Sequence, residues 1–548
     1  MKRRKFCQLG LATGITAPMI LTQARAQGAG LSSIVNTRSG QLQGYRNDSV
    51  EIFKGIPYGE EASGSRRFMP PVPKAAWRGV RNATVFGTRS AQLFRPTIPE
   101  IGDALTGTGP MSEDSLKLNV WTPDANSRTR KPVLIWYHGG GFRTGSGNSP
   151  YYDGEQLARY HDMVVVTITH RINALGFMLL NDAPGGRYEA SANLGMQDIL
   201  LALQWVRDNI ENLGGDPDNI TISGQSGGGG KTSMLHAMPQ AQGMFHKAII
   251  MSTLTETSVV APPLEEAIEA RDILLSRLGV RLNNTDALHE MPWEVIVHAM
   301  GRQGEGRDNA DISARFNPHV DGSVIAFNPF DPVSSPLTSN IPVLTGSNET
   351  EGVPYGNPND EFWQSEPGND QELTVTVARS LRIPEAEARE IIELFRVNRP
   401  DASHGDLALI INAESSAARH SSYIIAERKA EENTSPCFLY LFQWDSPVMQ
   451  GKLRSMHCME IPFFFDHIDN TAFMNGRGRE QYTLAWKMAQ SWSAFTHTGN
   501  PSHEGIPNWP AFNKDTWPTM IFGNNTRLEN DPYGQERRAI SSIVNARA

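Results

Sequence analysis

Ser226 stands at the centre of residues 224–228, which read Gly-Gln-Ser-Gly-Gly. An apolar, β-branched run at 220–222 precedes this segment, and residues 229–238 can continue as a helix. The pattern predicts a strand, a sharp turn and a helix, in which the flanking glycines avoid a Cβ clash and the serine side chain is exposed. Ser226 would then be a nucleophile. The alternative is a glycine-rich loop without a chemical role.

A serine hydroxyl is a weak nucleophile near neutral pH, so it needs a general base, an acid that orients the base, and donors for an oxyanion. Residues 138–142, His-Gly-Gly-Gly-Phe, follow the strand-like run 133–136. Consecutive glycines let backbone N–H groups face a ligand, which suits an oxyanion hole completed by the N–H of Gly227. A flexible glycine loop is the alternative, and a nucleophile further along the chain makes it the weaker one.

The acid and the base are expected in the order nucleophile, acid, histidine that α/β-hydrolases follow. Glu349 and Glu351 come directly after the apolar run 341–344, so both lie at the carboxyl end of a predicted strand. His457 follows another such run, 438–442, after a loop. Because the sequence has 14 histidines, it is this position that favours His457 as the base. Both glutamates remain candidates for the acid.

The elements that must position these residues are apolar runs that alternate with helical stretches, which is typical of a mostly parallel sheet covered by helices. Two amphipathic helices are predicted, one over 195–213 and one that ends near Gly499. We therefore expect an α/β fold with one catalytic domain over residues 27–548, and with insertions over the sheet at 93–109 and 264–309. The predicted buried strands are 133–136, 163–168, 220–222, 247–251, 341–344 and 438–442.

Residues 1–26 are predicted to be an export signal that is not part of the fold. Arg3 and Arg4 form a twin-arginine pattern in a basic start, an apolar segment follows at 9–21, and Ala-Arg-Ala at 24–26 is a small-x-small cleavage site. An ordinary basic N-terminus is the alternative. With the signal, the protein would fold in a bacterial cytoplasm and be exported to the periplasm or secreted.

The composition narrows the choice of partners. Removal of the signal takes away five positive charges and no acid, so the formal net charge moves from −9 to −14. An acidic chain argues against nucleic acid or an anionic membrane surface as a partner, and no apolar stretch is long enough to span a bilayer. Cys437 and Cys458 are the two cysteines outside the signal, and we expect them to be free thiols.

From about residue 35 to 523 the chain resembles the type B carboxylesterases, the group that includes cholinesterases and bacterial p-nitrobenzyl esterases. The matching stretches are Phe53 to Tyr58, Arg67 to Pro71, Ser112 to Pro123, His138 to Phe142, Gly214 to Pro217, Gly224 to Gly228 and Thr498 to Pro501. The resemblance implies an α/β-hydrolase fold in which Ser226 is the nucleophile, Glu351 the acid and His457 the base. It also implies an oxyanion hole made by Gly140, Gly141 and Gly227. Glu349 is the alternative acid, two residues early for the family's pattern.

The activity that the resemblance implies is hydrolysis of a small-molecule carboxylic ester through an acyl-enzyme, without a metal or cofactor. The same triad could serve amides, carbamates, lactones or polyesters. Adhesion proteins related to cholinesterases share the fold without catalysis, but they typically lack a triad member, and all three members are present here. The sequence contains no His-Glu-x-x-His segment or close Cys/His cluster, which disfavours a metal hydrolase.

Three departures from the family pattern alter these expectations. Ser115 and Ala91 stand where the family has two bridged cysteines, so no disulfide is expected there. Gln225 replaces the usual glutamate before the nucleophile, which removes a negative charge and makes a choline ester an unfavoured substrate. Cys458 replaces the usual glycine after the histidine, and we interpret it as a buried packing residue rather than an oxidisable one.

Overall fold

The computed structural model describes residues 30–93, 106–180, 186–304, 309–352 and 366–545. The predicted export signal lies outside these residues, as does most of the predicted insertion at 93–109. No helix in the described ranges is both long enough and apolar enough to cross a membrane.

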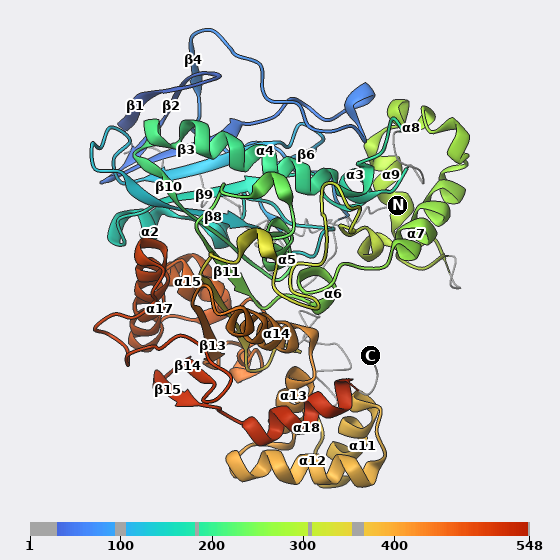
Figure 1. The fold of residues 1–548 in the computed structure, drawn as a ribbon, viewed down its shortest axis with the longest axis vertical. Helices are drawn as coiled ribbons and strands as arrows, with labels where there is room; N and C mark the ends of the chain where they lie inside the picture. The colour runs from blue at the N-terminus through green and yellow to red at the C-terminus, as the bar shows by residue number, and fades with distance from the viewer. Residues whose placement is uncertain (1–29, 94–105, 181–185, 305–308, 353–365, 546–548) are drawn as a thin grey trace, which may run out of the picture.

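A single large sheet runs through the molecule (Figure 1), and in the described residues it has 13 strands. Seven strands in the middle of the sheet, β9, β8, β10, β11, β12, β13 and β14 in spatial order, are parallel neighbours. The strands at both margins pair antiparallel, except that the short strand β4 pairs parallel with β2. The predicted, mostly parallel α/β fold is therefore confirmed. In spatial order the strands are β1 (Gly30–Thr37), β2 (Gly40–Asn47), β3 (Val50–Pro57), β7 (Lys117–Thr122), β9 (Val164–Thr169), β8 (Lys131–Tyr137), β10 (Gly215–Gln225), β11 (Lys247–Met251), β12 (Val343–Asn348), β13 (Cys437–Gln443), β14 (Pro518–Gly523) and β15 (Arg527–Asn530), with β4 (Val80–Asn82) beside β2 and a separate pair β5 (Arg89–Ser90) and β6 (Met111–Ser112).

The six predicted strands are β8 to β13, and every residue of β9 and β11 is buried. Side chains on β8 alternate between the two faces of the sheet. Ile135 packs in the core that contains Leu203 of α4 (Leu194–Asn209), and Trp136 packs in the core that contains Trp492 of α17 (Arg479–Thr498). The two predicted amphipathic helices thus cover opposite faces.

Both of these helices end at a glycine. Residues 210–213 continue α4 as a 3₁₀ turn, and Gly214 closes it with a φ of 80°. Gly499 closes α17 with the same φ, and its N–H donates to Phe495 O at 2.7 Å. This left-handed conformation costs glycine little, which explains why these glycines stop the helices.

The insertion predicted at 264–309 is helical and contains α7 (Leu264–Leu278), α8 (Ala287–Glu290) and α9 (Trp293–Met300), which lie together at one side of the sheet in Figure 1. A second helical group, not predicted from the sequence, packs around its own apolar core below the sheet (Figure 1). It consists of α11 (Asp370–Leu381), α12 (Glu385–Asn398), α13 (His404–Glu414) and α18 (Gly534–Asn545). The other α-helices of the described residues are α2 (Glu155–Tyr160), α3 (Asn173–Phe177), α5 (Gly227–Leu235), α6 (Thr255–Ser258), α14 (Ala417–Glu432), α15 (Ile461–Phe464) and α16 (Ala472–Asn475).

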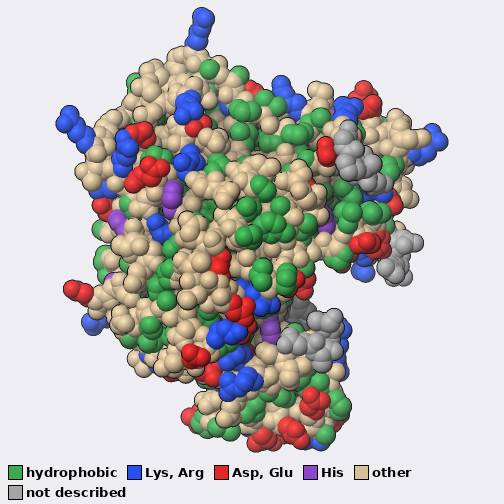
Figure 2. Space-filling view, viewed as in Figure 1, with side chains coloured by type: hydrophobic (Ala, Val, Ile, Leu, Met, Phe, Trp, Pro, Cys, Tyr) green, Lys and Arg blue, Asp and Glu red, His purple; other side chains and the backbone are tan. Residues whose placement is uncertain are grey.

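On the face drawn in Figure 2, basic and acidic side chains are interspersed and no single basic area forms.

In the interior, Cys437 and Cys458 are buried and no disulfide joins them, as predicted. Ser115, which stands where the family has one of two bridged cysteines, accepts a hydrogen bond from Ser90 Oγ at 2.9 Å. Ser90 is the neighbour of Ala91, so the two substituted positions do lie close together.

Candidate active site

Ser226 occupies the turn between β10 and α5. Its φ of 58° and ψ of −129° lie outside the ordinary helix and strand regions, and such strain in a non-glycine residue is typical of a nucleophile at a strand-to-helix turn. The Ser226 N–H donates to Met251 O of the neighbouring strand β11 at 2.9 Å, and Ser226 O accepts from the Gly230 N–H at 3.1 Å. These bonds fix the strained backbone at both sides of the serine.

The glycines around Ser226 allow this turn to form. A Cβ added at Gly224 would overlap the backbone of Gly228, and one added at Gly228 would overlap the carbonyl oxygen of Tyr137. The first turn of α5 therefore lies against the ends of β10 and β8 at a distance that only glycine permits.

The loop after β8 lies beside the serine. A Cβ added at Gly139 would come within 3.5 Å of Ser226 Cβ, and one added at Gly227 would overlap Gly141 O. Gly140 and Gly141 have φ values of 88° and 62°. Among the described residues, neither of their N–H groups donates to a protein acceptor, so both remain available to a ligand. The structure brings all three predicted oxyanion glycines together next to Ser226.

His457 and Glu351 are in direct contact, although 106 residues separate them. The His457 Nδ1–H donates to Glu351 Oε2 at 2.5 Å, and Glu351 Oε1 accepts from the Asn348 N–H at 2.8 Å. Glu349 points elsewhere, since its Oε1 accepts from Gln443 Nε2 at 2.6 Å. Of the two candidate acids, it is Glu351 that faces the histidine.

Burial and mutual attraction compete in this pair. Burial by itself raises the pKa of Glu351, but the charge of His457 and their hydrogen bond outweigh it and hold that pKa below its usual range. Burial lowers the pKa of His457, and the charge and hydrogen bond of Glu351 outweigh it and raise that pKa. The pair therefore stabilises a protonated imidazole, which is the state that a general base reaches when it has taken a proton.

The residues next to the serine and the histidine link the two. The amide nitrogen of Gln225 lies 3.3 Å from His457 Nδ1 and 3.4 Å from Nε2. The Cys458 thiol donates to the amide oxygen of Gln225 at 3.1 Å and is buried in the core, in keeping with the predicted packing role. Since Gln225 precedes Ser226 and Cys458 follows His457, these contacts set the imidazole next to the turn that carries the serine.

A second buried carboxyl group lies behind the acid and was not predicted. Glu460 Oε2 accepts from Asn348 Nδ2 at 2.6 Å, and Glu460 Oε1 accepts from Ser252 Oγ at 3.0 Å. Burial, and then the charge of Glu351, raises the pKa of Glu460 to about 7. The sequence signal for Glu460 is only its position three residues after His457. Lys231, also missed, could have been noticed as a charged residue in a glycine-rich, otherwise uncharged segment.

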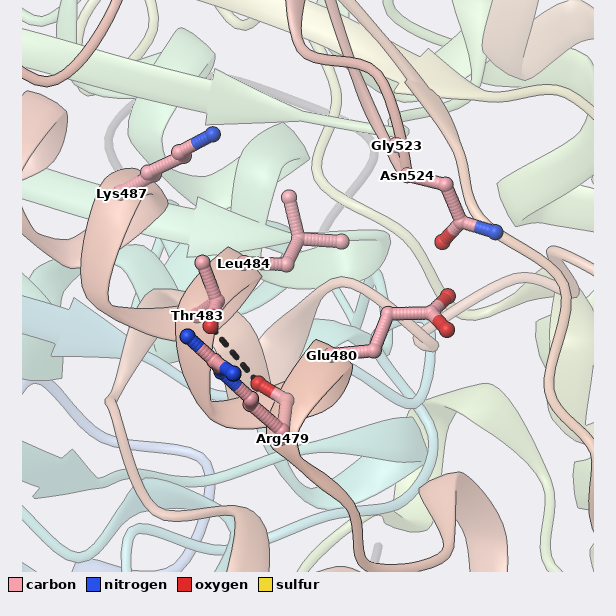
Figure 3. Close-up of a pocket in the computed structure, with 7 residues that line it drawn as sticks. All are labelled: Arg479, Glu480, Thr483, Leu484, Lys487, Gly523 and Asn524. Atoms are coloured by element: carbon pink, nitrogen blue, oxygen red, sulfur yellow. Dashed lines mark hydrogen bonds between the residues drawn. The ribbon is translucent and has the colours of Figure 1, made fainter.

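Other places in the described part of the chain offer less chemistry. No group of three His, Cys, Asp or Glu side chains there is arranged to hold a metal ion. A cavity of about 350 Å³ lies between α17 and the end of β14 (Figure 3). Of its charged side chains, Glu480 already accepts a hydrogen bond from Trp444 Nε1. None of the predicted catalytic residues lines it. The lining residues are Arg479, Glu480, Thr483, Leu484, Lys487, Gly523 and Asn524.

Comparison with known proteins gives matches over nearly the whole chain. The profile of the Carboxylesterase family matches residues 31–539. The para-nitrobenzyl esterase of Bacillus subtilis (strain 168) is 30% identical over 513 residues, covering 92% of this chain and 98% of that protein. The phenmedipham hydrolase of Pseudarthrobacter oxydans is 31% identical over 513 residues, covering 90% and 95%. A solved esterase from anaerobic Clostridium hathewayi, described as able to hydrolyse aliphatic aromatic polyesters, has a TM-score of 0.78 at 30% identity and covers 93% of this chain and 98% of its own.

Proposed function

Because the chain belongs to the carboxylesterase family, we propose that it is a serine hydrolase of carboxylic esters that forms an acyl-enzyme at Ser226. The proposed catalytic residues are Ser226, Glu351 and His457, and Gly140, Gly141 and Gly227 form the proposed oxyanion hole. The proposed substrate is a small molecule, and the reaction needs no metal or cofactor.

The proposed mechanism depends on the position of the His457 proton and on the N–H donors of the three glycines. Glu351 accepts from His457 Nδ1–H and so leaves Nε2 free of a proton. Nε2 takes the Ser226 hydroxyl proton while Oγ bonds to the ester carbonyl carbon, and the N–H groups of the three glycines stabilise the negative oxygen. The imidazolium then gives its proton to the leaving alcohol. Water repeats these steps on the acyl-enzyme and releases the acid.

The observation that carries the proposal is the 2.5 Å hydrogen bond between His457 and Glu351, next to a serine held in a strained turn. Its test is labelling of the purified protein with a fluorophosphonate, followed by mass-spectrometric mapping. We expect stoichiometric label on Ser226 and loss of the label in His457→Ala, whereas His404→Ala, on the outer helix α13, should label like the wild type. A folded wild-type protein without label would favour a non-catalytic binding protein instead.

A second candidate is hydrolysis of carbamates or polyesters by the same residues. Two relatives favour it, the phenmedipham hydrolase and the polyester-hydrolysing esterase. Comparison of kcat/KM for an ester, a carbamate and an amide that share one acyl or aryl group would separate these activities. The ester should be the fastest of the three.

The domain organisation and location are part of the same proposal. Residues 1–26 would be a twin-arginine export signal and 27–548 one catalytic domain, which is supported by the basic start and the cleavage pattern. Mass determination of the exported protein should give an N-terminus at Gln27. Retention of residues 1–26 in the exported protein would contradict it.

A further inference from the structure

Lys231 is fully buried on α5, one and a half turns beyond the nucleophile. Its ammonium group donates to His138 O at 2.8 Å and to Gly141 O at 3.1 Å, and it lies 5.0 Å from the centre of the Phe142 ring. All three contacts are to the loop 138–142, which carries the glycine donors of the proposed oxyanion hole.

Each carbonyl oxygen of this loop segment has a hydrogen-bond donor, so the peptide planes are held. His138 Nδ1 lies 2.9 Å from Gly139 O, and the Thr144 N–H donates to Gly140 O at 3.1 Å. Because a peptide N–H points opposite to its carbonyl, these two bonds set the directions of the Gly140 and Gly141 N–H groups. Lys231 holds the carbonyl oxygens on either side of these two, those of His138 and Gly141.

The charge of Lys231 has no balancing anion among the described residues, since no carboxylate there forms an ion pair with it. The ionisable groups facing it are His138 and His170, whose rings stack at 4.9 Å. Burial, and then the charge of Lys231, lowers the pKa of His138 far below its usual range. The pKa of His170 is lowered far below its usual range too, and burial and the charge of Lys231 are again its two largest causes. Burying an unpaired ammonium group is costly, so its retention beside the glycine donors needs a reason.

We propose that Lys231 is a positioning residue of the oxyanion hole, which clamps the loop through the carbonyl oxygens of His138 and Gly141 and stabilises the negative oxygen of the transition state. The inference rests on the proposed function. An anion that exists only during the reaction would be the partner that the ammonium group lacks in the resting protein.

The first test compares Lys231→Gln, which keeps a neutral donor, and Lys231→Met, which removes it, with the wild type. Lys429→Met is the control for loss of a buried lysine, because Lys429 donates to a backbone carbonyl, Ser339 O, at 2.9 Å, but on α14; unlike Lys231, it also pairs with a carboxylate, Glu432, at 2.7 Å. In the folded Lys231 variants we expect kcat for a p-nitrophenyl ester to fall on the order of 100-fold, the effect of losing one oxyanion donor, with KM changed little. Lys429→Met should keep the wild-type kcat.

The second test separates the oxyanion from general damage to the fold. The Ser226 oxygen adds to the carbonyl carbon of a trifluoromethyl ketone, and the hydroxyl proton passes to His457. The π electron pair of the carbonyl moves onto its oxygen, which becomes negative. Its affinity should fall by the same factor as kcat/KM in the Lys231 variants, because both report the same charge. A purely structural role would lower the melting temperature without this correspondence.

A folded Lys231→Gln protein with wild-type kcat, or with unchanged ketone affinity, would overturn the inference. If neither variant folds, ketone binding to the wild type decides, after correction for the protonation of His457 measured from the acid limb of the kcat/KM profile. Burial lowers the pKa of Lys231 to about 7, so the corrected affinity should weaken as pH rises above that value. A corrected affinity that is independent of pH from about 7 to 9 would refute the role of the charge. A wild-type protein that neither hydrolyses esters nor takes label at Ser226 overturns the proposed function and this inference together.

Discussion

Replacement of Glu351 by Gln removes a charge while it keeps the shape of the side chain. Glu351 Oε1 is held by the Asn348 N–H, so the new amide oxygen should take this position. The amide nitrogen would then take the place of Oε2, 2.5 Å from His457 Nδ1, and would donate to it. The imidazole must then carry its proton on Nε2, where it cannot accept the proton of Ser226.

The magnitude follows from this wrong tautomer. A comparable carboxylate-to-amide change in a serine protease triad lowers kcat about 10⁴-fold, which corresponds to about 5.4 kcal/mol of transition-state stabilisation. The pKa of His457 should also fall, because burial lowers it and the opposing charge of Glu351 is gone. The assay is steady-state hydrolysis of a p-nitrophenyl ester together with the rate of fluorophosphonate labelling at Ser226.

Glu349→Gln is the matched control, because the same change is made two residues away, on a carboxylate that faces Gln443 and not His457. We expect it to keep kcat within a few-fold of the wild type. A Glu351→Gln enzyme within tenfold of the wild type, with Glu349→Gln strongly impaired, would refute the assignment of the acid. Melting temperatures of both variants show whether either loss reflects unfolding.

Three further predictions address the base, the glycines and the specificity. Because Glu351 raises the pKa of His457, the acid limb of the kcat/KM profile should lie above the usual pKa of a histidine, and an acid limb below it would contradict this. Gly228→Ala places a Cβ against the Tyr137 carbonyl oxygen and should destabilise the protein by about 1–3 kcal/mol, measured by denaturant unfolding, while Gly30→Ala, with open space around it, should not. A neutral ester should be hydrolysed with a higher kcat/KM than the choline ester of the same acid, and Gln225→Glu should narrow the difference; a wild-type preference for choline would disprove the specificity argument.

The parts of this protein that the sequence predicts are those with local signals. The strand before Ser226 and its flanking glycines are contiguous, so the strand, turn and helix could be derived without any tertiary information. The six buried strands follow for the same reason, since burial on both faces produces continuous apolar runs.

The parts that the sequence does not predict depend on contacts between distant residues. Glu349 and Glu351 both follow the same strand, and only the tertiary contact of Glu351 with His457 separates them. The helical group of α11, α12, α13 and α18 brings α18 to helices that end at least 120 residues earlier, and no local pattern specifies that pairing. Lys231 stands out as a charged residue in an uncharged, glycine-rich segment, but its two carbonyl acceptors lie on another segment and could not be predicted.

The buried charges of the site have signs opposite to those that the proposed reaction creates. Positive charge develops on His457, and the carboxylate of Glu351 lies behind it; negative charge develops on the substrate oxygen, and the ammonium group of Lys231 lies behind the loop that faces it. Glu460 would upset this balance if it were ionised beside Glu351, but burial raises its pKa to about 7, and burial lowers the pKa of Lys231 to about 7. Below that pH, Glu460 therefore holds a proton and Lys231 carries its charge. One anion behind the base and one cation behind the oxyanion loop are therefore the arrangement expected of a site that stabilises a charge-separated transition state in a region with little water.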